Sequence, residues 1–502
     1  MNIQYLSSLF LIAFLSFSLT AQQETSKKDQ KVYEFPEKSI TRHSSTVNGK
    51  KLNYTATVGH MNMLDEDGKE LSHVFYIAYT KDNVADNSKR PVTFVFNGGP
   101  GSSSVWLHMG ALGPKRLLMT DDGLSLPPPY KTVENDYSWL DKTDLVFIDP
   151  VETGYSRPAE DYETKDFAGY KEDLKSVGDF IHKYVTANGR WNSPKFLAGE
   201  SYGTTRASGL SGYLQDRHGM FLNGIVLISA IMNFQTAYFT NGNELPYSLF
   251  LPSFAASAYH HGKVDKAKYP DFDSFKEEVE TFALGDFTLA MMKGDQLSEK
   301  EEKELAEKLS DYLGLSKEFL KQHHYRISTP LFTKELLRDE GHTIGRFDAM
   351  VKGKDKKDAG DHYDFDPSYN LSIYGGYTMA INHHLYHELK YENSDQVYEI
   401  LTGKVWPWNY NNVQNKFLNT SETLRSAIHK NPHLNVLICN GYYDLATPYF
   451  ATEYTVNHMF LDSEYRDNVQ LTYYHGGHMM YSIKEELRKF TKDVRNFYDN
   501  AY

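Results

Sequence analysis

Short apolar runs separated by turns recur along much of the chain. Residues 54–58 and 73–79 form the first two runs and predict antiparallel strands. The later runs are apolar nearly throughout and rich in β-branched or aromatic residues: 92–96, 145–148, 196–198, 224–228, 436–438 and 469–474. Strands that are buried on both faces have this pattern, and helical stretches such as 166–187 separate them. The pattern therefore predicts a mostly parallel central sheet covered by helices on both faces.

The stretch 233–414 has a different pattern, without alternation of strands and helices. It carries helical patches at 273–292, 298–313, 316–324 and 377–389, and a charged loop at 352–364. We interpret it as a mainly helical cap inserted into the core, because caps of this kind roof an active site. The expected division of the chain is a flexible segment at 22–45, core at 46–232, cap at 233–414 and core again at 415–502.

Residues 1–21 are typical of a secretion signal. An apolar stretch at 9–19 is followed by polar residues 23–31 and is too short to span a bilayer. The alternative is an ordinary buried N-terminal segment. No cysteine follows the apolar stretch, so we expect no lipid attachment and no stable membrane anchor.

The chain has one cysteine, Cys439, within an apolar run, where we expect a buried thiol. If the protein is secreted, the lack of any possible internal disulfide favours a bacterial periplasmic or secreted protein over a eukaryotic one. The net charge of −13 and the lack of a long basic run argue against nucleic acid as a partner. At 502 residues and 40% hydrophobic content, the chain is able to bury a large core.

A serine flanked by glycines follows one of the predicted strands. The run 196–198 leads into Gly199-Glu200-Ser201-Tyr202-Gly203, and a segment able to form a helix comes next. A strand, a sharp turn that carries the nucleophile and a helix make up the nucleophile elbow of an α/β-hydrolase. We therefore expect an α/β-hydrolase fold, with a central mostly parallel sheet and the inserted cap, and Ser201 as nucleophile.

A serine nucleophile needs a base that accepts its proton and a carboxylate that orients the base. In this fold the acid follows the serine along the chain, and the histidine follows the acid. Asp444 lies in the turn after the strand 436–438, and His478 follows two glycines after the strand 469–474. We expect Ser201, Asp444 and His478 to form the triad, with His475 as the alternative base.

A glycine-rich loop, Asn97–Ser104, follows the predicted strand 92–96. Donors for an oxyanion are expected from such a loop and from the backbone N–H after the nucleophile, which belongs to Tyr202. The loop lacks the Gly-Lys-Ser/Thr ending of a phosphate-binding P-loop. The i,i+4 pair His383 and His387 and the aspartates of 355–366 lack the order of zinc and calcium motifs. We expect neither a metal nor a cofactor.

The chain resembles the serine carboxypeptidase family, and most of all its bacterial branch. The matching segments are Asn97–Ser104, Asp149–Ser156, Gly199–Gly203, Gly441–Pro448 and Gly477–Met479. The resemblance implies that Ser201, Asp444 and His478 form the triad and that Gly99 and Tyr202 supply the oxyanion N–H groups. It also implies that a peptide substrate's C-terminal carboxylate binds through Asn97 and Glu200, with Gly98 and Met479 in the same substrate site.

The chain departs from the pattern of eukaryotic members at a few positions. Ala111 occupies the place of a second glutamate, Val95 that of a tryptophan and Ser102 that of a disulfide cysteine. A carboxylate bound beside Glu200 would leave one of the two acids protonated, which predicts activity at acidic to neutral pH. Three alternatives stay open: a carboxylesterase or acyltransferase, a proline-releasing aminopeptidase of the same fold, and a non-catalytic binding protein on this scaffold.

Overall fold

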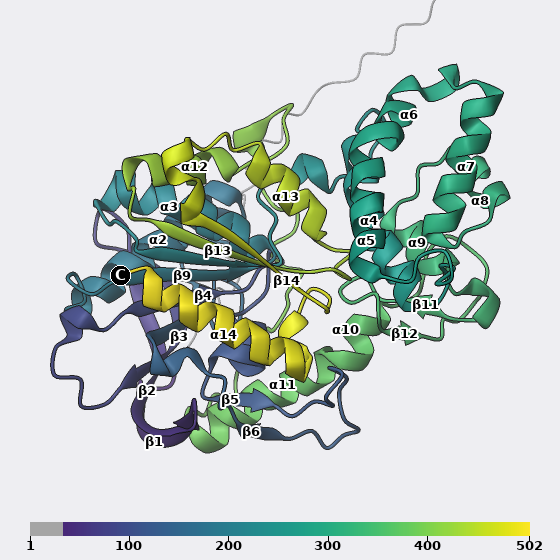
Figure 1. Cartoon of the computed structure of the whole chain (residues 1–502). Helices are drawn as coiled ribbons and strands as arrows, with labels where there is room; N and C mark the ends of the chain where they lie inside the picture. The colour runs from purple at the N-terminus through teal and green to yellow at the C-terminus, as the bar shows by residue number, and fades with distance from the viewer. Residues whose placement is uncertain (1–33) are drawn as a thin grey trace, which may run out of the picture. The chain divides into compact units, whose positions relative to one another are not determined.

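The computed structural model describes residues 34–502 (Figure 1). The secretion signal predicted at 1–21 and the first part of the flexible segment predicted at 22–45 lie outside the described residues. The prediction of flexibility is wrong for the end of that segment, because strand β1 already begins at Ser39. Its residues pair with β2 in a regular antiparallel register from Ser39 opposite Val58 to Val47 opposite Lys50. The backbone hydrogen bonds of that ladder hold this polar stretch in place.

The central sheet has the strand order β1-β2-β3-β7-β4-β9-β10-β13-β14. The strands from β7 to β14 are parallel, and β1, β2 and β3 extend the sheet in antiparallel pairs. The bounds are β1 Ser39–Val47, β2 Lys50–Leu64, β3 Glu70–Lys81, β4 Val92–Phe96, β7 Asp144–Ile148, β9 Lys195–Glu200, β10 Gly224–Ile228, β13 Asn435–Gly441 and β14 Val469–Tyr474. The predicted mostly parallel sheet is confirmed.

Short strands complete the β-structure. Strand β8 (Arg157–Pro158) pairs with β3, β5 (Lys115–Leu117) pairs with β6 (Thr132–Glu134), and β11 (Thr343–Ile344) pairs with β12 (Lys352–Gly353). The short helix α1 (Val105–Leu107) follows the glycine-rich loop after β4.

Helices cover both faces of the sheet, which explains why its central strands are apolar throughout. Helices α2 (Tyr170–Ala187), α3 (Tyr202–His218) and α12 (Ser421–Lys430) lie on one face, and α14 (Lys484–Asn500) lies on the other (Figure 1). Neighbouring residues of β4 show the division. Phe94 packs in the cluster that contains Phe180 of α2, whereas Val95 packs in the cluster that contains Phe490 of α14.

The stretch between β10 and β13 is mostly helical, and its helices belong to two different hydrophobic clusters. Those from α4 to α9 pack mainly among themselves, whereas α11 packs into the core beneath the sheet together with α14. The helices are α4 Leu245–His260, α5 Phe272–Phe282, α6 Thr288–Lys293, α7 Glu299–Leu313, α8 Lys317–Gln322, α9 Thr329–Glu335, α10 Pro367–Ser372 and α11 Tyr374–His383. Helix α13 (Tyr449–Asn457) follows β13 and contacts α4. The cap boundaries stay a prediction.

The single helix predicted at 273–292 is wrong in detail. Helix α5 ends at Phe282, and a π-helical turn with a non-helical Gly285 (φ −101°, ψ −105°) separates it from α6. Glycine tolerates such backbone angles, and the apolar periodicity on either side does not reveal the break. Among residues 34–502, no helix combines the length and the apolar character that crossing a membrane requires.

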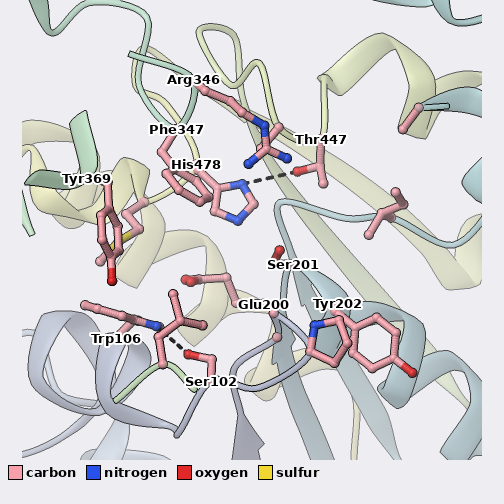
Figure 2. Close-up of a pocket in the computed structure, with 18 of the residues that line it drawn as sticks. Ser102, Trp106, Glu200, Ser201, Tyr202, Arg346, Phe347, Tyr369, Thr447 and His478 are labelled. Carbon is pink, nitrogen blue, oxygen red and sulfur yellow. Dashed lines mark hydrogen bonds between the residues drawn. The ribbon is translucent and has the colours of Figure 1, made fainter. Parts of the chain in front are cut away.

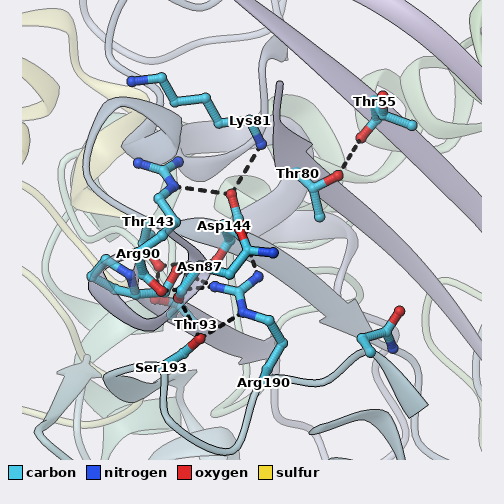
Figure 3. Close-up of polar contacts among 12 residues, drawn as sticks. Thr55, Thr80, Lys81, Asn87, Arg90, Thr93, Thr143, Asp144, Arg190 and Ser193 are labelled. Atoms are coloured by element: carbon cyan, nitrogen blue, oxygen red, sulfur yellow. Dashed lines mark hydrogen bonds and ion pairs between the residues drawn. The ribbon is translucent and has the colours of Figure 1, made fainter. Parts of the chain in front are cut away.

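A buried ion-pair network lies at the end of the sheet where β7 begins (Figure 3). Asp144 accepts hydrogen bonds from Arg90 Nε at 3.0 Å and from Arg190 Nη1 at 2.6 Å. The backbone N–H of Lys81 also donates to Asp144, at 3.0 Å. These contacts join β3, β7 and the segments before β4 and β9. The candidate site lies at the opposite end of the sheet, where β9 and β13 terminate.

Candidate active site

Ser201 lies in a strained turn between β9 and α3. Its φ of 59° and ψ of −129° are uncommon for a residue with a side chain, and its N–H donates to the Ile228 carbonyl at 3.0 Å. The flanking glycines are sterically required, because a Cβ atom on Gly199 would lie 2.2 Å from the Gly203 carbonyl oxygen. The strand, turn and helix predicted from the sequence are therefore present.

Asp444 follows the end of β13 and accepts hydrogen bonds on both carboxylate oxygens. Oδ2 lies 2.7 Å from His478 Nδ1 and accepts from the Thr447 hydroxyl at 2.8 Å. Oδ1 accepts from the backbone N–H groups of Ala446 at 2.8 Å and Thr447 at 3.0 Å. The carboxylate is fully buried, so these contacts fix its orientation toward the imidazole.

His478 is held by its backbone as well as by its ring. Its N–H donates to the Phe347 carbonyl at 2.5 Å, and its carbonyl accepts from the Ser229 hydroxyl at 2.6 Å. Figure 2 shows the imidazole and the Ser201 hydroxyl facing one another across a cavity. The alternative base, His475, is exposed, and its ring packs against Tyr442 instead of lining the cavity.

The surroundings of His478 favour its charged form. Burial alone would lower the pKa of His478, but the charge and hydrogen bond of Asp444 outweigh it, and the charge of Glu200 acts in the same direction. The net result is a pKa above the ordinary value of histidine. A base with this environment is stabilised after it has accepted a proton from Ser201.

The glycine-rich loop after β4 passes beside the first turn of α3. A Cβ atom on Gly98 would lie 2.4 Å from the backbone nitrogen of Tyr202, so only glycine allows this approach. Gly99 has a φ of 103°, and both Gly99 and Tyr202 line the cavity. Tyr202 is the first residue of α3, where backbone N–H groups have no partner within the helix and the helix dipole favours negative charge.

Glu200 lies in the cavity wall immediately before Ser201, and its carboxylate accepts two hydrogen bonds. The Asn97 amide donates to Oε1 at 2.9 Å, and the Tyr481 hydroxyl donates to Oε2 at 2.5 Å. Burial raises the pKa of Glu200 to about 7, although His478 and these two hydrogen bonds oppose the shift. Glu200 is therefore an acid that exchanges a proton near neutral pH.

The structure places Asn97 behind Glu200 rather than in the cavity wall. Asn97 is fully buried, and its side-chain oxygen accepts from the Leu107 N–H at 3.1 Å. Asn97 Nδ2 donates one N–H to Glu200, and its second N–H has no hydrogen-bond partner among residues 34–502. The direct contact between Asn97 and substrate that the family resemblance implies stays a prediction. Gly98, Glu200 and Met479, the other residues predicted to bind substrate, do line the cavity.

The cavity has a volume of ≈ 640 Å³, and aromatic side chains line much of it. Trp106 and Phe347 each pack against Tyr369. Phe234 packs against both Tyr202 and Tyr410, and Tyr238 also lines the cavity. Ser102 also lines it and accepts a hydrogen bond from Trp106 Nε1 at 2.6 Å (Figure 2). Ala111, at the position of the second glutamate, is buried in the core and does not line the cavity.

Sequence reasoning missed several of these residues. Arg346, Phe347 and Tyr369 reach the cavity from the stretch 233–414, whose pattern gives no sign of which residues face the site. Tyr481 belongs to no recognisable sequence motif, although it follows His478 closely along the chain. Within the part of the chain that the structure describes, no three His, Cys, Asp or Glu side chains gather to hold a metal ion.

The chain is similar in sequence to known carboxypeptidases. The chain is 34% identical over 155 residues to the pheromone-processing carboxypeptidase KEX1 of Saccharomyces cerevisiae strain JAY291, covering 29% of this chain and 20% of that protein. It is 30% identical over 154 residues to carboxypeptidase Y of S. cerevisiae, covering 30% of this chain and 25% of that protein. The matches thus span only a fifth to a quarter of those relatives. They are fungal proteins, so they do not support the predicted bacterial branch.

A solved structure covers far more of the chain. The crystal structure of Kex1ΔP, a prohormone-processing carboxypeptidase from S. cerevisiae, superposes with a TM-score of 0.54 at 17% identity. It covers 89% of this chain and 91% of that one, which supports the α/β-hydrolase fold. The family model described as serine carboxypeptidase matches residues 47–494, from the last residue of β1 into helix α14. The chain belongs to the serine carboxypeptidase family.

Proposed function

We propose that this protein is a serine-type carboxypeptidase that releases C-terminal residues from peptides through an acyl-enzyme. In this proposal Ser201 is the nucleophile, His478 the general base and Asp444 the carboxylate that orients it. Gly99 and Tyr202 donate their backbone N–H groups to the oxyanion. Glu200, Gly98 and Met479 contact the substrate's last residue, and Asn97 holds Glu200 in position.

The observation that carries the proposal is the position of Glu200. A buried carboxyl group whose pKa is raised to about 7 lines the cavity directly beside Ser201 and faces the same space as His478. A general esterase does not need an acid there. A protonated carboxyl group is suited to donate a hydrogen bond to a substrate carboxylate, which distinguishes a peptide's free end from its interior.

The reaction follows from these roles. Ser201 Oγ attacks the carbonyl carbon of the last peptide bond as its proton passes to His478 Nε2, and the carbonyl oxygen becomes an oxyanion at the two N–H groups. The C–N bond then breaks, and His478 gives the proton to the departing amine. Water next attacks the ester on Ser201, again with His478 as base, and releases the shortened peptide.

The test compares the cleavage of a peptide that has a free carboxyl terminus with that of its amidated twin, across about pH 4 to 8. Ser201→Ala is the control. Mass spectrometry is expected to show stepwise loss of C-terminal residues from the free acid far faster than from the amide. Loss of N-terminal residues would instead support a proline-releasing aminopeptidase. Ester hydrolysis without peptide cleavage would support an esterase or acyltransferase, and no turnover of either would support a binding protein.

We further propose that the protein is exported to a bacterial periplasm or to the exterior. The support is the apolar stretch 9–19 with its polar flank and the lack of a second cysteine. In the structure the thiol of Cys439 is buried, in keeping with a structural role. Comparing the N-terminal sequence of protein from the cell envelope with that of the whole chain would show whether residues 1–21 are removed.

A further inference from the structure

The cavity that contains Ser201 and His478 has one strongly basic side chain. Among its lining residues, Arg346 is the only lysine or arginine and Glu200 the only carboxylate. Arg346 is exposed, and Figure 2 shows its guanidinium extending over His478 and Thr447. The whole chain has a net charge of −13, so a lone cation in this cavity runs against the general charge of the protein.

The backbone of Arg346 is anchored between the two loops that carry Asp444 and His478. Its N–H donates to Asp366 Oδ2 at 3.1 Å, and its carbonyl accepts from the Leu445 N–H at 3.0 Å. The next residue, Phe347, accepts from the His478 N–H. These bonds fix the point from which the side chain leaves the backbone. Arg346 is therefore positioned with the catalytic loops rather than on an independent surface segment.

The guanidinium itself has no acidic partner. It stacks over the Phe347 ring at 5.2 Å, and no Asp or Glu among residues 34–502 forms an ion pair with it. Three buried arginines behave differently, since Arg90, Arg190 and Arg206 each pair with an aspartate. The donors of Arg346 thus remain available to a ligand, and their fork geometry matches a carboxylate.

The position of Arg346 has an electrostatic consequence for the base. Its charge opposes protonation of His478, whereas Asp444 and Glu200 favour it. A negatively charged group bound to Arg346 would cancel that repulsion just as His478 takes up the proton of Ser201. An anionic substrate group at this place would therefore gain both a hydrogen-bonded partner and a better-stabilised imidazolium.

We propose that Arg346 selects peptides that carry an Asp or Glu side chain on one of the two residues flanking the scissile bond. This inference rests on the proposed carboxypeptidase function, in which the terminal carboxylate lies beside Glu200. Two side chains of the cavity then bind two different parts of the substrate. Glu200, next to Ser201, contacts the terminal carboxylate, and Arg346, on the far side of His478, contacts an acidic side chain.

The test uses peptides that differ only in their last two residues, with Glu, Gln, Lys or Ala at either place. The measured quantity is the ratio of kcat/KM for the Glu peptide to that for its Gln twin. This ratio cancels changes in overall activity. We expect the wild type to favour Glu about tenfold at one of the two positions, because a charge-assisted hydrogen bond is lost with Gln.

In Arg346→Gln the ratio is expected to fall to about one, in Arg346→Lys to keep part of its value, and in Arg346→Glu to shift the preference to Lys peptides. Arg425→Gln is the matched control, because Arg425 lies on α12 outside the cavity and pairs with Glu422. Thermal melting of each variant establishes that it is folded.

The result that overturns the inference is a Glu-to-Gln ratio that is the same in wild type and Arg346→Gln, or near one in both. A variant that loses only its discrimination between free and amidated termini would also overturn it, because Arg346 would then bind the terminal carboxylate. Failure of the proposed function looks different: the wild type would release no C-terminal residue even from the Ala peptide. That result would remove the basis of this inference as well.

Discussion

The side-chain amide of Asn97 donates a hydrogen bond to Glu200 Oε1 at 2.9 Å, so two residues 103 positions apart form one unit. Only Glu200 of the pair lines the cavity. Asn97 is in turn held by the Leu107 N–H, and its carbonyl accepts from Arg206 Nη1 at 2.6 Å. The pair orients a carboxyl group beside Ser201 and gives Asn97 a positioning role.

Asn97→Ala is expected to lower kcat/KM for free-acid peptides by about 10- to 100-fold, because Glu200 loses a hydrogen bond that orients its carboxyl group beside Ser201. The same loss raises the pKa of Glu200, since the Asn97 bond opposes that shift. Hydrolysis of a small ester without a free carboxylate is the control. Equal losses on the ester and the peptide would show that Asn97 has only a general structural role.

The pKa of Glu200 predicts the alkaline side of the pH profile. Burial raises the pKa of Glu200 to about 7, so its carboxyl group is neutral below that pH and charged above it. A peptide's terminal carboxylate is charged throughout this range. Repulsion therefore grows as the pH rises through about 7, and kcat/KM for free-acid peptides is expected to fall there. Glu200→Gln removes the titrating group and should abolish this decline. A decline of the same shape in the variant would assign it to another group.

Asp444→Asn tests the orientation of the base. The carboxylate accepts from His478 Nδ1 at 2.7 Å, and an amide in its place would favour the wrong imidazole tautomer. We expect kcat to fall by about 10⁴-fold, the size of the effect of this substitution in the Ser-His-Asp triad of a serine protease. Thr447→Val removes one hydrogen-bonding neighbour of Asp444 and should cost only about tenfold. Rates within threefold of wild type in Asp444→Asn would contradict the triad.

Asp144→Ala tests the buried network at the other end of the sheet. Removing the carboxylate leaves Arg90 and Arg190 buried without their partner, which is expected to cost about 3–5 kcal/mol of unfolding free energy. Asp499→Ala is the matched control, because its pair with Lys142 is exposed and should contribute little. Denaturant melts measure both variants. The folded fraction of Asp144→Ala should keep its kcat, because the network lies away from the cavity.

The sequence predicted the features that lie at the ends of patterned strands. Ser201, Asp444 and His478 each follow an apolar run, and parallel strands bring their carboxyl ends to one edge of the sheet, so chain order and strand order together locate them. The strands β4 and β10 have the predicted bounds, 92–96 and 224–228. Both faces of these strands are buried, which explains why their sequences are apolar without interruption.

Contacts between distant segments could not be predicted from the sequence. The Tyr481 hydroxyl binds Glu200 across 281 positions, and no motif marks it. Arg346 lies in a stretch whose helices belong to two hydrophobic clusters, so periodicity does not reveal which residue faces the cavity. The substrate-binding role expected for Asn97 came from family resemblance, and the hydrogen bond from its amide to Glu200 is visible only in the structure.

Trapping the acyl-enzyme is the most direct test of Ser201 as the nucleophile of a carboxypeptidase. A peptide with a free carboxyl terminus is mixed with the protein, the reaction is quenched in acid, and the mass of any adduct on Ser201 is measured, with Ser201→Ala as control. We expect an adduct equal to the peptide without its last residue, because the acyl group lies on the N-terminal side of the cleaved bond. An adduct of the first residue alone, or an adduct that persists in Ser201→Ala, would contradict it.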